Sequence, residues 1–135
     1  LAVEQVGIRR ANQEVKVNVA AIQEWLRTTA ADPRLIALNR AEHEAKLTSL
    51  LRTKTEIEAI WSNRLDGSFI FSLPEAGLLN AKGREWWKRA IAGQVFQSEV
   101  YVSAITKQLC LTVSVPILEA HGKVVGVIGA DISIS

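Results

Sequence analysis

Apolar residues in the first thirty positions repeat with the spacing of a helix. The residues at this seven-residue spacing and at its companion positions are Leu1, Ile8, Val15, Ile22, Ala11, Asn18 and Trp25. The pattern predicts one long helix over residues 1–30, about 45 Å in length, which is longer than a small domain needs. We therefore expect the stripe to pack on a second copy of the chain, with Asn18 helping to set the register. A helix hairpin within one monomer is the alternative.

A second helical segment is expected over residues 34–54. Asp32 is a capping residue and Pro33 suits the first turn of a helix, so the chain should break between the two helices here. Glu42 and Lys46 lie four residues apart in the order that favours a helix. The apolar positions of this segment are irregular, which leaves open one helix or two shorter pieces.

From residue 56 onward, apolar and polar residues alternate with the period of a strand. The expected elements are a hairpin at 57–73, a short helix at 84–92 and strands at 96–105, 108–118 and 123–133. Asp66-Gly67 is a typical hairpin turn, and Gly93 is a typical residue at a helix end.

This order of elements predicts an α+β fold, in which a long N-terminal helix is followed by a five-stranded antiparallel sheet flanked by helices. We expect a single domain over residues 1–135, with a helical N-terminal part at 1–55 and a sheet module at 56–135. The chain contains no methionine, which suggests a piece of a longer protein.

Composition narrows the classes of protein. Hydrophobic residues make up 48% of the chain and charged residues 22%, as in folded proteins. The net charge is +2 and no basic block occurs, which argues against a nucleic-acid partner. No apolar run reaches the ~20 residues that cross a bilayer, so any membrane anchor is expected in flanking segments outside this chain.

The pattern of reactive side chains does not indicate catalysis. The single cysteine, Cys110, lies between two leucines of an expected strand, as inert thiols do, and His43 and His121 are far apart. No nucleophile has an activating neighbour, and no glycine-rich phosphate loop occurs. We therefore expect no enzyme activity, no cofactor and no metal site.

Five short motifs follow one another between residues 57 and 133. They are Asp66-Gly67, Gly83-Arg84-Glu85-Trp86-Trp87-Lys88-Arg89-Ala90, Ser98-Glu99-Val100-Tyr101, Thr112-Val113-Ser114-Val115-Pro116-Ile117 and Gly126-Val127-Ile128-Gly129-Ala130-Asp131-Ile132. In this order they resemble the Cache family, the extracytoplasmic PAS-like sensor domains of bacterial chemoreceptors and sensor histidine kinases. The resemblance implies a PAS-like sheet and, with one module after the leading helix, the single-Cache type.

Four residues of these motifs have the chemistry of a small-ligand site. Arg84 opens the short helix, and its guanidinium matches a carboxylate in shape and charge. Trp86 is suited to the wall of an apolar pocket. Asp131 lies in an apolar strand and needs a polar partner, and Tyr101 is a possible donor. In amino-acid-binding Cache domains the matching Arg and Trp hold the ligand carboxylate, and the matching Tyr and Asp hold its ammonium group.

Three positions depart from that amino-acid-binding pattern. Leu79 and Trp87 stand where the pattern has tyrosines, and Ser103 stands where it has a second aspartate. Trp87 and Ser103 stay on the set of candidate ligand-binding residues. With one acidic partner missing, a small organic acid fits at least as well as an amino acid. The alternatives for the charged residues are that Arg84 only pairs with a surface carboxylate and that Asp131 is structural.

The resemblance and the residues together predict the ligand-sensing domain of a transmembrane signalling receptor, lying outside the cytoplasmic membrane. We expect it to bind a small carboxylate-containing ligand, to pass a conformational signal to the membrane, and to form a homodimer through its N-terminal helix. One alternative is a ligand-free dimerisation module of a membrane receptor. A second alternative is a cytoplasmic PAS-type module.

Overall fold

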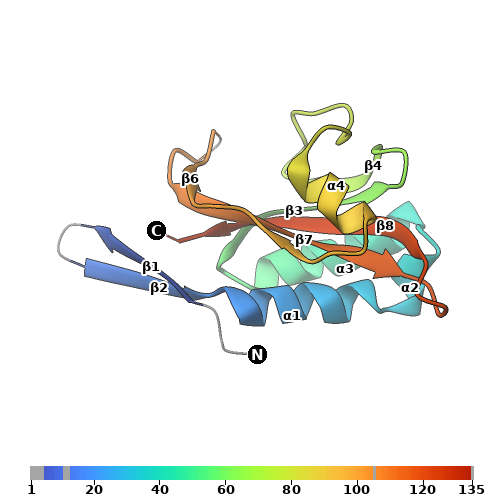
Figure 1. Ribbon diagram of the computed structural model, residues 1–135, viewed down its shortest axis with the longest axis horizontal. Coiled ribbons are helices and arrows are strands. Elements are labelled where there is room, and N and C mark those ends of the chain that lie inside the picture. The colour runs from blue at the N-terminus through green and yellow to red at the C-terminus, as the bar shows by residue number, and fades with distance from the viewer. Residues whose placement is uncertain (1–4, 11–12, 105, 135) are drawn as a thin grey trace.

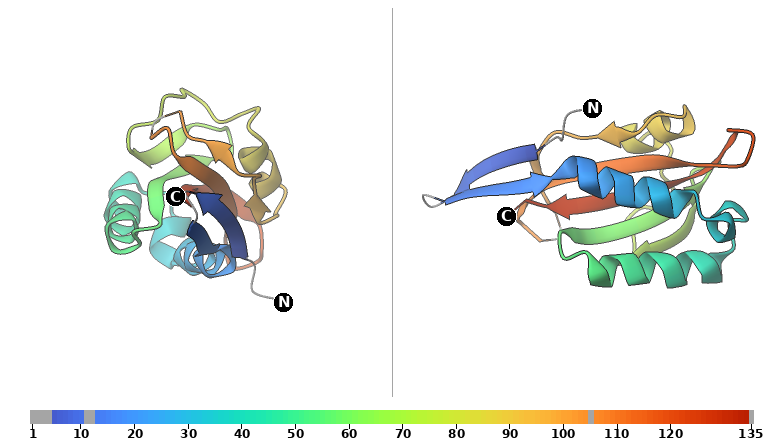
Figure 2. Two further views of the ribbon diagram at one scale, coloured as in Figure 1. Left: turned by 90° about the vertical axis from the view of Figure 1, so that its left-hand side faces the viewer. Right: turned by 90° about the horizontal axis from the view of Figure 1, so that it is seen from below.

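Helices pack on both faces of a central antiparallel sheet (Figure 1). The computed structural model describes residues 5–10, 13–104 and 106–134. In chain order the elements are β1 (Gln5–Arg10), β2 (Gln13–Asn18), α1 (Val19–Ala30), α2 (Pro33–Ile36), α3 (Arg40–Thr53), β3 (Ile57–Arg64), β4 (Phe69–Leu73), α4 (Glu85–Ile91), β5 (Phe96–Gln97), β6 (Tyr101–Val102), β7 (Leu109–Leu118) and β8 (Val124–Ser133). The two views of Figure 2 show α1 and α3 on one face of the sheet and α4 on the other.

The sheet confirms the predicted α+β class, with six strands where five were expected. Its order is β4-β3-β8-β7-β5, and β6 also pairs with β7. The expected strand at 96–105 is divided into β5 and β6. Between them the backbone N–H of Thr112 donates to the hydroxyl oxygen of Ser98 at 2.8 Å, so a side chain replaces a backbone acceptor and interrupts the ladder.

The predicted hairpin between the first two strands of the sheet is confirmed. Gly67 has a φ of 86°, which a residue without a β-carbon adopts at little cost. The backbone N–H of Arg64 donates to the carbonyl of Ser68 at 2.9 Å and closes the turn. Asp-Gly therefore joins β3 to β4 as its turn chemistry predicts.

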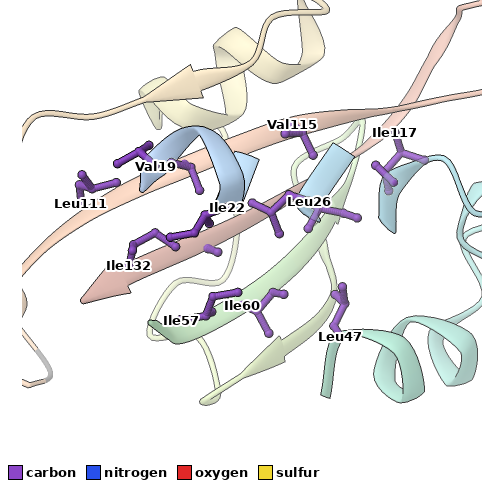
Figure 3. Packing of buried hydrophobic residues seen from close by; sticks show 14 of the residues in the cluster. Val19, Ile22, Leu26, Leu47, Ile57, Ile60, Leu111, Val115, Ile117 and Ile132 are labelled. Carbon is purple, nitrogen blue, oxygen red and sulfur yellow. The ribbon is translucent and has the colours of Figure 1, made fainter. Parts of the chain in front are cut away.

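The main hydrophobic core lies between the sheet and the layer of α1 and α3 (Figure 3). Val19, Ile22 and Leu26 on α1 are between 0% and 1% exposed and pack on side chains of β7 and β8. Ile22, which belongs to the stripe that was expected to bind a second copy, is therefore already buried in the monomer. The alternative was a helix hairpin within one monomer, whereas in the structure this face of α1 packs on the sheet of its own chain.

The predicted long helix is wrong over residues 5–10 and 13–18, which are strands. Helix α1 begins at Val19, and the side chain of Asn18 caps it by accepting the backbone N–H of Ala21 at 2.9 Å. Residues 5–10 and 13–18 form the antiparallel strands β1 and β2, which project from the end of the domain (Figure 1). The expected helical part at 1–55 thus contains two strands, while Leu1 and Ala11 lie outside the described residues.

The physical reason is that a period of two also fits this segment. Between Gln13 and Asn18, polar residues alternate with the β-branched Val15 and Val17, which favour extended backbone. A capping residue then stands at the boundary with α1. The seven-residue spacing predicted one helix because it combined Ile8 and Val15, which lie in the hairpin, with Ile22, which lies in α1.

This correction makes a direct prediction for Ile8 and Val15, which are paired across the β1–β2 hairpin. In the double variant Ile8→Cys/Val15→Cys, we expect a disulfide within one chain, because paired residues of neighbouring strands lie within disulfide reach. Non-reducing electrophoresis and mass spectrometry measure it. The control pair Val6→Cys/Val15→Cys is out of register and should form less of it. Cross-links between chains alone would instead support the helical stripe.

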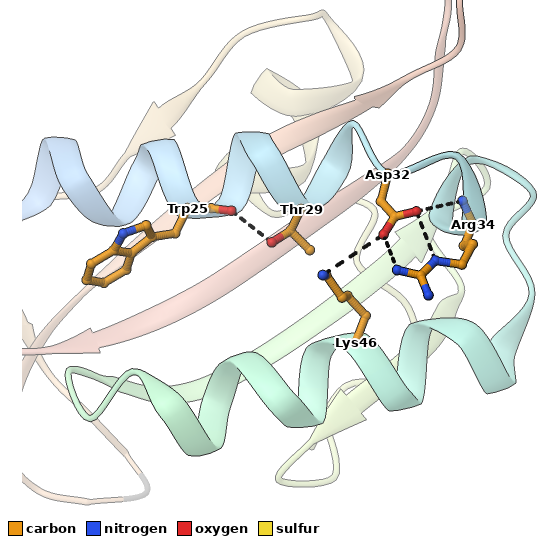
Figure 4. A network of polar contacts seen from close by, with 5 residues as sticks. All are labelled: Trp25, Thr29, Asp32, Arg34 and Lys46. Carbon is orange, nitrogen blue, oxygen red and sulfur yellow. Dashed lines mark hydrogen bonds and ion pairs between the residues drawn. The ribbon is translucent and has the colours of Figure 1, made fainter.

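The break between the first two helices is confirmed, and the segment that follows is divided into α2 and α3. Asp32 caps α2 by accepting the backbone N–H of Arg34 at 2.9 Å, and its other carboxylate oxygen pairs with the guanidinium of Arg34 (Figure 4). These hydrogen bonds to Arg34 lower the pKa of Asp32 to about 2. Lys46 on α3 approaches the same carboxylate at 4.0 Å. A charged cluster therefore holds the corner between the helices.

His43 is a buried structural histidine. One ring nitrogen, Nε2, lies 2.8 Å from the carbonyl oxygen of Leu35, and Nδ1 lies 2.8 Å from the hydroxyl of Ser62. A carbonyl only accepts, so Nε2 donates to it and Nδ1 accepts from Ser62. Burial lowers the pKa of His43, which favours this neutral form. The ring ties α2 and α3 to β3.

Candidate functional site

A cavity of about 210 Å³ lies on the face of the sheet opposite α1 and α3. Its walls come from β3, β4, β6, β7 and β8, from α4 and its N-cap, and from the loop after β4. The lining residues are Ala59, Trp61, Phe69, Ser72, Pro74, Glu75, Ala76, Gly77, Leu78, Arg84, Trp86, Tyr101, Thr112 and Asp131. The hydroxyl of Ser114 donates to the backbone carbonyl of Trp86 at 2.7 Å and fastens α4 to β7 beside this cavity.

Asp131 is one of two carboxylates among the lining residues, together with Glu75 of the loop after β4. Asp131 stands opposite Thr112 in the β7–β8 register, and the Thr112 hydroxyl donates to Asp131 Oδ1 at 2.7 Å. The hydroxyl of Tyr101 lies 3.2 Å from the same oxygen and 2.7 Å from Thr112 Oγ1. Burial raises the pKa of Asp131, while the two hydroxyls act in the opposite direction because they donate to the ionised form. The carboxylate is thus oriented by neighbours.

Arg84 supplies the basic part of the cavity. It is the N-cap residue of α4, and its side chain makes no capping hydrogen bond. Arg84 is exposed and lines the cavity, and in the described part of the chain no carboxylate forms an ion pair with its guanidinium. The alternative of a surface ion pair is therefore not observed for Arg84 among these residues. With no ion pair to any of these residues, the guanidinium is suited to bind a ligand anion.

The two adjacent tryptophans of α4 face different environments. Trp86 lines the cavity, and its ring centroid lies 5.2 Å from that of Trp61, with 59° between the ring planes. Trp87 is 8% exposed, packs in a second cluster with Ala81 and Val127, and donates its indole N–H to the carbonyl of Arg64 at 3.3 Å. Trp87 is a core residue in this structure and does not line the cavity.

Ser103 also lies away from the cavity. It is buried in the turn between β6 and β7, where its hydroxyl oxygen accepts the backbone N–H of Thr106 at 3.2 Å. Leu79 is 98% exposed, whereas its neighbour Leu78 lines the cavity. Of the six candidate residues, the structure brings together Arg84, Trp86, Tyr101 and Asp131.

The candidates chosen from sequence did not include Thr112 and Trp61. Thr112 faces Asp131 across two neighbouring strands, and Trp61 shares a face of β3 with Ala59. The period of two places each residue on one face of its strand, but only the pairing of β3, β7 and β8 brings these faces to the cavity. The strand register was the missing information.

The fold and cavity define a PAS-like sensor domain of the kind found in chemoreceptors. The chain belongs to the family described as methyl-accepting chemotaxis protein-like, first PDC sensor domain, whose model matches residues 35–135. This match confirms the resemblance to Cache-type sensor domains. The model describes a first sensor domain, so the single-Cache type stays a prediction.

Solved chemoreceptor structures have the same fold. The ligand-binding domain of the Pseudomonas aeruginosa PAO1 amino acid chemoreceptor PctC, in complex with GABA, is 20% identical at a TM-score of 0.70, over 87% of this chain and 54% of that one. The ligand-binding domain of the Campylobacter jejuni chemoreceptor Tlp3, in complex with L-valine, is 20% identical at a TM-score of 0.63. This match covers 85% of this chain and 52% of that one. The ligand-binding domain of the Pseudomonas fluorescens chemoreceptor CtaA, in complex with L-serine, is 29% identical at a TM-score of 0.50. This match covers 83% of this chain and 52% of that one. This chain thus spans about half of each solved domain.

Proposed function

We propose that this sensor domain binds a small amino acid, with the carboxylate at Arg84 and the ammonium group at Asp131. The observation that carries the proposal is that Arg84, which has no ion-pair partner among the described residues, and the oriented carboxylate of Asp131 line one cavity. Arginine pairs with carboxylates through two parallel hydrogen bonds. Asp131 offers the negative charge that an ammonium group needs, and Trp86 gives the same cavity an apolar surface.

Two observations separate this ligand from the alternative, a simple organic acid. Asp131 lines the cavity, and its charge would repel a second carboxylate and attract an amine. The similar solved domains were crystallised with GABA, L-valine and L-serine, each of which carries both a carboxylate and an amine. The organic acid stays the second candidate, because burial raises the pKa of Asp131 and thereby favours its neutral form.

The setting of the domain is part of the same proposal. It lies outside the cytoplasmic membrane as one sensor domain of a transmembrane receptor, is anchored by flanking segments, and acts by binding without catalysis. None of the helices in the described part of the chain is long and apolar enough to cross a membrane. A homodimer remains a prediction, although the α1 stripe proposed for it is buried in the monomer. The rival is a dimerisation module that binds no ligand.

Thermal unfolding tests the proposal against that rival. The isolated domain is screened with L-amino acids and small organic acids. A ligand at 100 times its dissociation constant should stabilise the folded state by about 2.7 kcal/mol. A complete screen without any shift in melting temperature would refute ligand sensing by this chain.

Asp131→Asn should separate the two classes of ligand. The variant keeps the shape and a hydrogen-bond acceptor but removes the charge, so L-alanine should bind about 30-fold more weakly, which corresponds to ~2 kcal/mol. Propionate differs from L-alanine only in lacking the amine and serves as the matched control, with little change expected. Titration calorimetry measures both. Equal losses for the two ligands would place the ammonium group elsewhere.

A further inference from the structure

Trp61 lies on strand β3 directly opposite Gly129 of β8, on the face of the sheet that forms the cavity floor. The absence of a side chain at Gly129 allows the indole ring to lie against the backbone of β8. A β-carbon at this position would lie 2.5 Å from Cε2 and 2.7 Å from Cζ2 of Trp61, and would also collide with Nε1. The ring position therefore depends on glycine at residue 129.

Packing, and not a hydrogen bond, holds this ring. Trp61 is 8% exposed and contacts Trp86 of α4 through the tilted ring pair. Its buried indole N–H has no hydrogen-bond partner among the described residues, whereas the equally buried Trp87 donates its N–H to Arg64. A buried donor without a partner is unfavourable, so the shape of the site imposes the orientation of Trp61.

We propose that Trp61, seated on Gly129, is a specificity-determining residue that sets how large an apolar group the cavity admits. This inference rests on the proposed function. The polar groups Arg84 and Asp131 would hold the ends that all amino acids share, so they cannot distinguish their side chains. Trp61 offers a large apolar surface in the same cavity, and any movement of its ring away from β8 reduces the space above it.

The first test is Gly129→Ala, which should push the indole into the cavity. Gly129 lies inside β8 and does not have a positive φ, so its backbone accepts alanine. Dissociation constants are measured for glycine, L-alanine, L-valine and L-leucine. We expect the affinity for L-leucine to fall by about 10-fold relative to that for glycine, because one or two methylene groups in an apolar pocket have effects of this size.

The second test is Trp61→Phe, which should enlarge the cavity and shift the preference towards larger side chains. Trp87→Phe is the matched control, since the two tryptophans are equally buried but only Trp61 lines the cavity. The control should lower the melting temperature by removing a hydrogen bond and should leave the ligand ranking unchanged. The double variant Gly129→Ala/Trp61→Phe should restore a ranking close to that of the original protein, because the smaller ring makes room for the new methyl group.

The outcomes distinguish the two proposals. If the unmodified domain binds none of these amino acids and no small carboxylate, the proposed function fails and this inference fails with it. If the domain binds amino acids with the same ranking in all variants, only the role of Trp61 is refuted. A ranking that changes equally in Trp87→Phe would also refute it, since Trp87 lies outside the cavity.

Discussion

Replacing Arg84 by alanine should weaken amino-acid binding strongly, by about as much as Asp131→Asn. The guanidinium lines the cavity and has no ion-pair partner in the described residues, so its removal takes away the cation proposed for the ligand carboxylate. Loss of one partner of a hydrogen-bonded charge pair costs about 2–5 kcal/mol, and the exposure of Arg84 favours the lower end, near a 30-fold rise in Kd. Titration calorimetry with L-alanine measures this change.

Lys88→Ala provides the matched control. Lys88 is an exposed cation on the same helix and does not line the cavity, so this variant removes the same charge at a short distance from the site. It should leave Kd nearly unchanged, and both variants should keep the melting temperature of the unliganded domain, since neither side chain is buried. Normal binding by Arg84→Ala would show that the ligand is held at another place.

Leu26→Ala should destabilise the fold strongly. Leu26 is fully buried in the core between α1 and the sheet (Figure 3), and the truncation removes apolar contacts and leaves a cavity. Such substitutions cost about 2–5 kcal/mol. Leu79→Ala is the control, because this leucine is 98% exposed and should change stability by less than about 0.5 kcal/mol. Urea denaturation measures the free energy of unfolding of both variants.

The same experiment also distinguishes a monomer core from a dimer interface. If Leu26 stabilises only the monomer, the loss in unfolding free energy does not depend on protein concentration. A loss that grows when the protein is concentrated would place the α1 stripe in a contact between chains. The expected independence follows from the burial of Val19, Ile22 and Leu26 against their own sheet.

A ligand of the proposed kind would change signalling only if it bound two arrangements of the domain with different affinity. The cavity is formed by α4 and by strands of the sheet whose opposite face carries α1. Strands β7 and β8 therefore contribute both to the site and to the core beneath α1. A shift of these strands on binding would reach α1 and the β1–β2 hairpin that precedes it.

Several strands, one hairpin and four residues of the candidate site were predicted from the sequence alone. The alternation of apolar and polar residues predicted β7 and β8, and the Asp66-Gly67 turn predicted the β3–β4 hairpin, because strand period and turn chemistry act within a few residues. The motifs also pointed to Arg84, Trp86, Tyr101 and Asp131, which the structure gathers around one cavity. The resemblance to the Cache motifs selected these four positions, and the charges of Arg84 and Asp131 fit the roles that it implies.

Tertiary structure alone decided the remaining features. The start of α1 at Val19 could not be predicted from the sequence, because the same spacing of apolar residues fits both a long helix and a hairpin followed by a shorter helix. Adjacent tryptophans look alike in sequence, yet α4 turns Trp86 to the cavity and Trp87 to the core. Thr112 and Trp61 reach the site through strand register, and Gly129 makes room for the indole. Local patterns assign a residue to a face of its element, whereas the packing of distant segments determines what that face meets.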